Sequence, residues 1–345
     1  MKETRYSDAG VNIDAADEAK RRISSAIKST HGPSVLGGIG GFGGLYSLSD
    51  LPEEPILVSS VDGVGTKLKL AFALNRHGTV GKDIVNHCIN DILVQGAKPL
   101  FFMDYLATGS LEPGVIEEVV DGIAEACRET DCALLGGETA EMPGFYTKGE
   151  YDLAGSIVGV VGRRQLITGD RISEGDVIIG LASSGLHTNG YSLARMVLLE
   201  QGDLSLTEPH PDLGRSVGDE LLEPHRCYAP AVLNLLGQCR INGMVHITGG
   251  GYDGNIPRVV PPGLTSALKR GSWNVNPVFH LIAEMGNVPE DEMYRTFNMG
   301  LGLLLFIHPD DADSTVDALT ASGEVVYRVG SVVKRTDGDP PVRFV

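Results

Sequence analysis

Residues 56–67 read ILVSSVDGVGTK, an apolar run followed by polar residues and glycines. The apolar part predicts a buried strand, and the residues after Lys67 predict a helix that continues to residue 74. A carboxylate at a strand end, beside backbone N–H groups, a hydroxyl and an ammonium, suits Mg²⁺ together with a phosphate. The candidates are therefore Asp62 as metal ligand and Gly63, Gly65, Thr66 and Lys67 as phosphate-binding residues. A plain tight turn with exposed polar residues is the alternative.

Strands and helices alternate on both sides of this stretch, which predicts α/β or α+β domains. Residues 163–176 are polar and rich in turn residues, so they are the best candidate for a domain boundary. The expected strands cover residues 56–61, 100–107, 133–135, 153–161, 177–181, 244–247, 301–307 and 325–333. The expected helices cover residues 14–28, 82–95, 113–129, 189–200, 228–238 and 277–285.

Length and composition predict two ordinary soluble domains in a chain of 345 residues. The formal net charge of -17 argues against nucleic acid and membranes as partners, because both carry negative charge. Residues 1–10 lack the apolar run of a signal peptide, and no segment is apolar enough to span a bilayer, so we expect a cytoplasmic protein. The five cysteines are never spaced as CxxC, which predicts free thiols.

The segment 37–44, GGIGGFGG, is too rich in glycine for a helix or a strand and must be a loop. Its letters fit GxGxxG, but no strand precedes it and no helix follows, so a dinucleotide-binding fingerprint is not expected. We prefer a mobile cover over a phosphate group, formed by Gly40, Gly41 and Gly43. A flexible turn without function is the alternative.

The helix expected from residue 82 carries Asp83, His87 and Asp91 at intervals of four, on one face, with Asn86 and Asn90 beside them. Such a face can present Asp91 and Asn90 to a cation. It is equally consistent with a solvated face.

Other polar residues follow predicted strands, where loops tend to carry catalytic groups. Residues 136–144 are expected to form a loop that contains Glu138 and Glu141. In the second half, the segments after the strands 177–181 and 244–247 could hold an anion or a sugar. The residues concerned are His187, Asn189, His246, Thr248, Gly249, Gly250, Asn255 and Arg258. Structural histidines and a helix cap are the alternative.

Together and in this order, these motifs closely resemble the aminoimidazole ribonucleotide synthetase family, the phosphoribosylformylglycinamidine cyclo-ligases. The resemblance covers essentially the whole chain. It is carried by residues 6–14, 37–44, 62–67, 90–91, 100–105, 136–144, 151–155, 187–191, 246–251 and 292–298.

The resemblance implies an N-terminal domain, residues 1–168, that binds ATP and forms a homodimer, and a C-terminal α/β domain, residues 169–345, that binds substrate. It also implies a purine-synthesis reaction, in which ATP drives ring closure of formylglycinamidine ribonucleotide to aminoimidazole ribonucleotide, with ADP and phosphate released. The implied roles are Mg²⁺ binding by Asp62 and Asp91, phosphate binding by Lys67 and the glycine-rich loop, and proton transfer by His187 or Glu141. Some relatives carry a lysine where this chain has Ser24, so a nucleotide contact from that helix is not carried over.

Relatives with other reactions are disfavoured by features of the sequence. The glycine-rich loop contains no cysteine for selenium handling, and residues 341–345 lack the terminal cysteine of the hydrogenase maturation protein. The same superfamily includes thiamine monophosphate kinase. A nucleotide-binding module without activity stays as the alternative from another class, and substrate-dependent ADP release would separate it from an enzyme.

Overall fold

The computed structural model describes residue 3 and residues 6–345. Its contacts divide the chain into two compact units, one formed by residues 1–92 and 99–160, the other by residues 93–98 and 161–345. Residues 93–98 therefore leave the first unit and belong to the second, which no sequence pattern predicted. The expected boundary after residue 168 stays a prediction. The expectation about residues 1–10 falls in part on residues 1, 2, 4 and 5, which lie outside the described residues.

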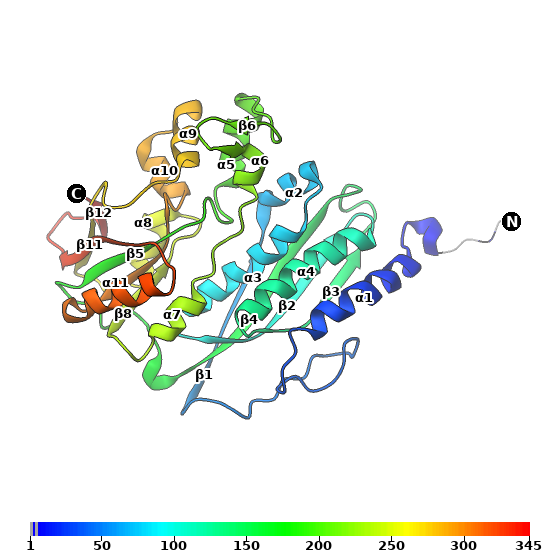
Figure 1. Cartoon of the computed structure of the whole chain (residues 1–345), viewed down its shortest axis with the longest axis horizontal. Coiled ribbons are helices and arrows are strands. Elements are labelled where there is room, and N and C mark those ends of the chain that lie inside the picture. Colours follow the sequence, from blue (N-terminus) through cyan, green and yellow to red (C-terminus); the bar gives the residue numbers. More distant parts are fainter. Residues whose placement is uncertain (1–2, 4–5) are drawn as a thin grey trace. The chain divides into compact units, whose positions relative to one another are not determined.

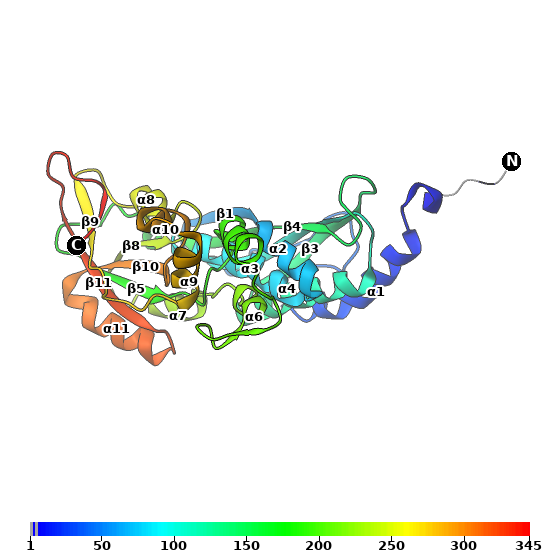
Figure 2. The ribbon, with the colours of Figure 1, turned by 90° about the horizontal axis from the view of Figure 1, so that it is seen from above.

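The first unit is a four-stranded sheet in the order β1-β4-β2-β3, with helices against one face (Figures 1 and 2). Its strands are β1 (Pro55–Gly63), β2 (Lys98–Thr108), β3 (Ala133–Glu141) and β4 (Tyr151–Gly162). Its helices are α1 (Ile13–Lys28), α2 (Leu68–Leu74), α3 (Gly78–Leu93) and α4 (Pro113–Glu129). The strand, turn and helix predicted from residues 56–74 are confirmed as β1, a short 3-10 turn over Gly65–Lys67 and α2.

Helices α3 and α4 approach each other closely because glycines face their partner's backbone. A Cβ atom on Gly122 would lie 2.0 Å from the carbonyl oxygen of Gly78, and one on Gly81 would lie 2.1 Å from that of Val119. Any larger residue would force the helices apart. The contact fixes α3, and with it the polar face at positions 83, 87 and 91.

The opposite face of this sheet exposes apolar side chains. On β1, Leu57 is 58% exposed and Val61 is 70% exposed, while on β2 Met103 is 38% and Tyr105 42% exposed. Alternate residues of a strand point to opposite faces. Adjacent side chains that point to the other face, such as Val58 and Phe102, are buried.

The second unit is built on a six-stranded sheet in the order β12-β9-β11-β5-β10-β8. Its strands are β5 (Val177–Ala182), β8 (Ile241–His246), β9 (Leu264–Leu268), β10 (Leu301–Ile307), β11 (Val326–Lys334) and β12 (Val342–Phe344). Strand β10 runs antiparallel to both β5 and β8. The latter two are therefore parallel to each other, and their carboxyl ends meet at one edge of the sheet.

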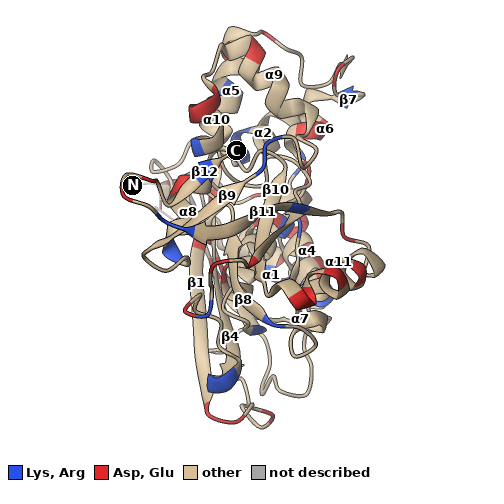
Figure 3. Ribbon diagram, turned by 90° about the vertical axis from the view of Figure 1, so that its left-hand side faces the viewer, with Lys and Arg blue, Asp and Glu red and all other residues tan. Residues whose placement is uncertain are grey.

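Helices cover both faces of this second sheet. Figure 2 shows α7 (Ala229–Leu235) and α11 (Ala312–Ala321) on one side and α8 (Gly251–Asn255) on the other. The remaining helices are α5 (Tyr191–Arg195), α6 (Val217–Leu221), α9 (Pro277–Gly286) and α10 (Glu290–Thr296). Figure 3 shows part of the acidic excess on α10, where Glu290, Asp291 and Glu292 occupy the first turn.

Several sequence-based boundaries were wrong. Residues Gly136–Glu141 are not a loop but the second half of β3, because their backbone continues the parallel ladder with β2 as far as Thr108 and Glu141. Strand β3 lies at the edge of the sheet, beside β2. The helix expected over 189–200 begins at Tyr191 and becomes a π-helix over Met196–Gln201. Strands β9 and β12 and helices α6, α10 and α11 were not predicted.

The structure agrees with the expectations about membrane spans and cysteines. Among the described residues, no helix combines the length and apolarity that a membrane crossing needs. All five cysteines are free thiols, and Cys88, Cys127 and Cys132 are buried.

Candidate active site

A carboxylate–imidazole cluster joins the end of β1 to α3 in the first unit. Nε2 of His87 lies 3.2 Å from Oδ2 of Asp62 and 3.8 Å from Oδ2 of Asp91. The hydroxyl of Ser60 donates to the same Asp91 oxygen at 3.0 Å. The two residues predicted to hold a metal are thus brought around one point, although one comes from a strand end and the other from a helix.

The charge state of His87 follows from this arrangement. Burial lowers its pKa, but the hydrogen bond to Asp62 and the charges of Asp91, Asp62 and Asp83 outweigh burial, so the net pKa is raised. A positive charge is therefore favoured between these carboxylates. The same electrostatics favour a bound cation.

Lys67 is fully buried and is paired with Asp83 of α3. Its ammonium donates to Oδ1 of Asp83 at 2.9 Å and lies 2.8 Å from Oδ2, and both side chains are 0% exposed. The alternative of an exposed, plain turn is therefore wrong for Lys67. A phosphate role for this residue stays a prediction, and the pair shows that Asp83 holds the turn after β1 against α3.

The backbone of this turn is shaped by glycine. Gly65 has φ +73°, a conformation that other residues rarely adopt. Val64 N–H donates to the carbonyl of Leu153 on β4 at 3.0 Å, which ties the turn to the sheet. Thr66 is exposed beside it, whereas Asn90 on α3 is fully buried.

The glycine-rich segment is a projecting loop whose base is closed by a short antiparallel pairing. Val35 and Tyr46 form an isolated bridge, and Leu36 N–H donates to Leu45 at 2.8 Å. Beyond the base, Gly40, Gly41 and Gly43 are exposed, and Phe42 is fully exposed. The loop prediction is confirmed, and its function as a phosphate cover stays a prediction.

Glu141 occupies an anchoring position. Its two carboxylate oxygens accept the backbone N–H groups of Asn12 at 2.6 Å and Leu111 at 2.7 Å. These residues precede α1 and α4. Glu141 thus ties these two segments to the end of β3, and a role in proton transfer for Glu141 or His187 stays a prediction.

In the second unit, the predicted residues collect at the edge where β5 and β8 end. His187 follows β5 and His246 ends β8; both are buried. His187 has φ +63°, which is uncommon for a residue other than glycine and is a strain often found at functional sites. Nε2 of this ring accepts the backbone N–H of Ser184 at 3.2 Å.

The loop after β8 completes this edge. Gly249 approaches Asn189 so closely that a Cβ on the glycine would lie 3.0 Å from the amide oxygen of Asn189. Gly250 has φ +91°, and the buried Asn255 donates to the carbonyls of Thr248 and Gly251. Arg258 instead is exposed, and its guanidinium donates to the carbonyl of Gly254.

One residue of this edge, His225, was missed by the sequence analysis. It is buried between α6 and α7, and its Nε2 lies 3.0 Å from Nε2 of His246. No strand end or periodic pattern precedes it, so the local sequence contained no signal. Asn298, part of the motif at 292–298, supports the same edge: its amide donates to Gly185 and its oxygen accepts from Ser183.

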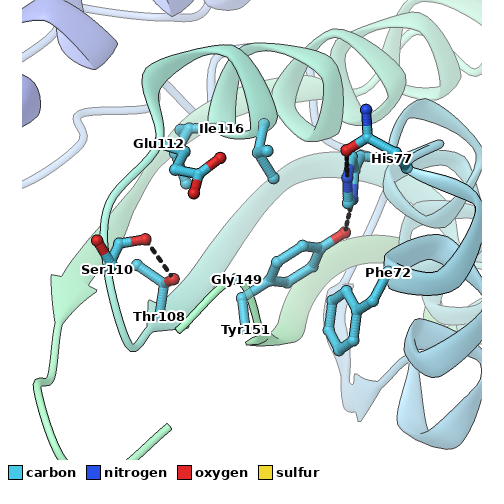
Figure 4. A pocket seen from close by; sticks show the side chains of 10 residues that line it. Phe72, His77, Thr108, Ser110, Glu112, Ile116, Gly149 and Tyr151 are labelled. Carbon is cyan, nitrogen blue, oxygen red and sulfur yellow. Dashed lines mark hydrogen bonds between the residues drawn. The ribbon is translucent and has the colours of Figure 1, made fainter. Parts of the chain in front are cut away.

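A separate cavity of about 190 Å³ lies in the first unit and contains none of the predicted site residues (Figure 4). His77 and Tyr151 form its polar wall, with Nδ1 of the imidazole 2.9 Å from the phenol oxygen. The pKa of His77 is lowered, because burial outweighs the opposite effect of the charges of Glu118 and Glu112. The chemistry of the predicted site is therefore not located in this cavity.

Comparison with known proteins decides the family. Residues 44–161 match the family model for the AIR synthase related protein, N-terminal domain, and residues 173–342 match that for the C-terminal domain. The phosphoribosylformylglycinamidine cyclo-ligase of Bacillus cytotoxicus is 52% identical over 330 residues, which cover 95% of each chain. That of Trichlorobacter lovleyi is 52% identical over 328 residues, 95% of this chain and 94% of the relative. The chain belongs to the phosphoribosylformylglycinamidine cyclo-ligase family.

Membership of the cyclo-ligase family confirms the resemblance stated from the motifs. The chain is an ATP-dependent ligase of purine biosynthesis with the two-domain AIR synthase fold. Solved structures share that fold. Thiamine-monophosphate kinase from Stenotrophomonas maltophilia has a TM-score of 0.70 at 19% identity, with 95% of each chain covered. HypE from E. coli has a TM-score of 0.69 at 18% identity, covering 95% of this chain and 93% of that one.

Proposed function

We propose that the chain converts formylglycinamidine ribonucleotide and ATP into aminoimidazole ribonucleotide, ADP and phosphate, with the phosphoryl chemistry at the Asp62–His87–Asp91 cluster. Family membership supports the overall reaction. The observation that carries the location is the convergence of two carboxylates on one imidazole nitrogen, at 3.2 Å and 3.8 Å.

The cluster fits Mg²⁺. Carboxylate oxygens are the ligands this ion prefers, and it binds proteins through one or two carboxylates together with substrate phosphates. Asp62 and Asp91 would hold it, and when bound it would neutralise charge on the transferring phosphoryl group. The raised pKa of His87 supports this proposal, because it shows that the carboxylates favour a positive charge between them.

The rest of the first unit positions the nucleotide. The turn at Gly63 and Gly65 offers backbone close to the cluster, and Asp91 is fixed by the hydroxyl of Ser60. Lys67 is paired with Asp83, and this buried pair holds the turn against α3. The projecting loop with Gly40, Gly41 and Gly43 would cover the bound phosphate chain. Positioning and charge neutralisation are the main requirements of phosphoryl transfer.

Chemically, the formyl oxygen attacks the γ-phosphorus of ATP, and ADP leaves. The oxygen then belongs to a phosphate ester, so it becomes a good leaving group. The amidine-side nitrogen attacks the former formyl carbon, the carbon–oxygen bond breaks, and phosphate departs with that oxygen. One N–H bond of the attacking nitrogen breaks while its electron pair stays on nitrogen, and His187 at the second-unit edge takes the proton.

We also propose a homodimer formed by the exposed face of the first sheet. Large apolar side chains are unusual on a solvated sheet, and Leu57, Val61, Met103 and Tyr105 form such a group there. A second copy would cover them. We expect the enzyme to act in the cytoplasm, as composition suggested.

Incubation with ATP and formylglycinamidine ribonucleotide tests the reaction directly. Aminoimidazole ribonucleotide, ADP and phosphate should appear in equal amounts. ADP without aminoimidazole ribonucleotide, or formed equally without the ribonucleotide, would contradict the proposal.

A further inference from the structure

Three buried imidazoles meet at the edge where β5 and β8 end. They come from three separate segments of the second unit: His187 from the loop after β5, His225 from the segment between α6 and α7, and His246 from the end of β8. Their ring nitrogens, one from each, lie within 4.8 Å of one another. Only two of the three were expected from sequence.

His225 is the connecting member. Its Nε2 lies 3.0 Å from Nε2 of His246, and its Nδ1 lies 3.2 Å from the hydroxyl of Thr188. Its ring also stacks on His187, with centroids 4.0 Å apart and planes inclined by 22°. It thus contacts both of the other imidazoles, through a hydrogen bond on one side and a ring face on the other.

A three-histidine metal site is one use of such a cluster, but this geometry opposes it. The lone pair of an imidazole nitrogen lies in the ring plane, so the lone pairs of two stacked rings run side by side and do not meet at one ion. Zinc needs convergent nitrogens at about 2.0–2.1 Å. In addition, Nε2 of His187 already accepts the N–H of Ser184.

The same geometry suits the sharing of a proton. Between two Nε2 atoms, one must carry the hydrogen and the other must accept it, and Thr188 contacts the remaining nitrogen of His225. A neutral His187 carries its hydrogen on Nδ1, because its Nε2 accepts from Ser184. Stacked imidazoles repel each other when both are charged, which favours at most one extra proton among the three rings.

Nearby charged groups of this unit are neutralised by partners. Glu220, which faces Gly185, pairs with Arg215 at 2.6 Å, and Glu324 pairs with Arg226 at 2.9 Å. Tyr228 behind His187 is a buried phenol that donates to the carbonyl of Ala182. These neighbours of the three imidazoles within the second unit are therefore already engaged with partners.

The geometry points to His225 as a positioning residue for proton transfer: it aligns His246 through their Nε2–Nε2 contact and couples that ring to His187, so that the proton released in ring closure is shared among three imidazoles. This assignment rests on the proposed function for its place in the reaction. The proton balance is unchanged, since one N–H proton of the substrate becomes one imidazolium proton, which is then released to solvent.

The substitution His225→Gln tests the assignment, because glutamine can hydrogen-bond to His246 but cannot carry a proton. We expect kcat to fall about tenfold and KM for ATP to stay unchanged. Loss of a general acid or base itself would lower kcat by roughly a hundredfold or more. The acid limb of the kcat–pH profile should also move. His280→Gln, the same change at an exposed histidine of α9, is the control and should alter neither.

A titration separates this inference from the proposed reaction. With ¹⁵N-labelled histidine, His187 and His246 should titrate as coupled rings in the original chain and as independent rings in His225→Gln, whether or not the chain is active. Identical His246 titrations in the two proteins would overturn the inference. So would one equivalent of Zn²⁺ bound by the original chain and lost in His225→Gln, which would establish a metal site.

A second variant covers the case in which His225→Gln fails to fold. Thr188→Val keeps all three imidazoles and removes the hydroxyl contact to Nδ1 of His225, together with the long contact from the Asn189 amide at 3.4 Å. The titration of His225 should then shift while His187 and His246 stay coupled. A titration of all three rings unaffected by this change would also contradict the positioning role.

Discussion

Nε2 of His87 lies 3.2 Å from Oδ2 of Asp62, so an imidazole from the middle of α3 is held at the end of β1. The second carboxylate of the cluster, Asp91, is one helical turn further along α3 and reaches the same nitrogen at 3.8 Å. The carboxylates of Asp62 and Asp91, which come from a strand and a helix, thus create one place where a positive charge is stabilised.

Asp91→Asn should remove most turnover without loss of the fold. The amide keeps the shape of the side chain but loses the charge that would hold Mg²⁺, and we expect kcat to fall by about a hundredfold or more. Steady-state ADP release over a range of Mg²⁺ concentrations measures this. Asp317→Asn on the exposed face of α11 is the matched control. Near-normal activity of Asp91→Asn at saturating Mg²⁺ would remove this residue from the metal site.

Asp83→Asn should destabilise the first unit. It leaves the fully buried ammonium of Lys67 without its carboxylate partner, and loss of one member of a buried pair costs about 3–5 kcal/mol. Urea unfolding measures the change. Replacing both residues, in Lys67→Met with Asp83→Leu, should cost less than Asp83→Asn alone. If Asp83→Asn lowered the free energy of unfolding by less than about 1 kcal/mol, the pair would not be shielded from water.

Asp104→Asn should flatten the pH dependence of stability. Burial raises the pKa of Asp104 from 3.8 to about 7, with Glu138 adding to the effect and a backbone hydrogen bond opposing it. A raised carboxyl pKa means that the unfolded chain releases this proton first, so stability is lost as pH rises from about 4 to about 7. The loss should be about 2 kcal/mol, because the side chain is only half-buried.

Urea unfolding at pH 5 and pH 8 tests this sign. The Asn variant should be more stable than the original chain at pH 8 and similar to it at pH 5. Asp317→Asn on the exposed face of α11 is the comparison variant. An unchanged difference between the two pH values would place the Asp104 pKa near its ordinary value.

Substrate labelled with ¹⁸O in the formyl group should yield labelled inorganic phosphate. An amide-type oxygen is a poor leaving group until it is phosphorylated, so the phosphoryl group should reach this oxygen before the ring closes. Mass spectrometry of the released phosphate measures the label. If the label appears in water, cyclisation precedes phosphoryl transfer, and the roles of Asp62 and Asp91 must be withdrawn.

Val61→Asp should separate a dimer into folded monomers. The side chain is 70% exposed on the open sheet face, so the change costs the single chain little but places a charge in the proposed interface. Sedimentation at micromolar concentration should show a dimer for the original chain and a monomer for the variant. A monomer in both cases would refute the interface.

Local spacing in the sequence identified many residues of the candidate site but few of the contacts between them. The strand, turn and helix after residue 56 followed from their own residues, and intervals of four placed Asp83, His87 and Asp91 on one helix face. These patterns depend on backbone geometry within a few residues. They predicted that Asp62 and Asp91 were available, and the tertiary structure decided that both reach His87.

Sequence by itself determined the α/β class, the family and most residues at the strand ends. Only the tertiary structure decided which partner each side chain takes: Lys67 pairs with Asp83, Glu141 binds the backbone before α1 and α4, and His225 joins His246. The physical reason is that secondary structure arises from neighbours along the chain, whereas these contacts join segments brought together by packing. A lone histidine in a loop such as His225 has no local periodicity, so its role is set entirely by the path of the chain around it.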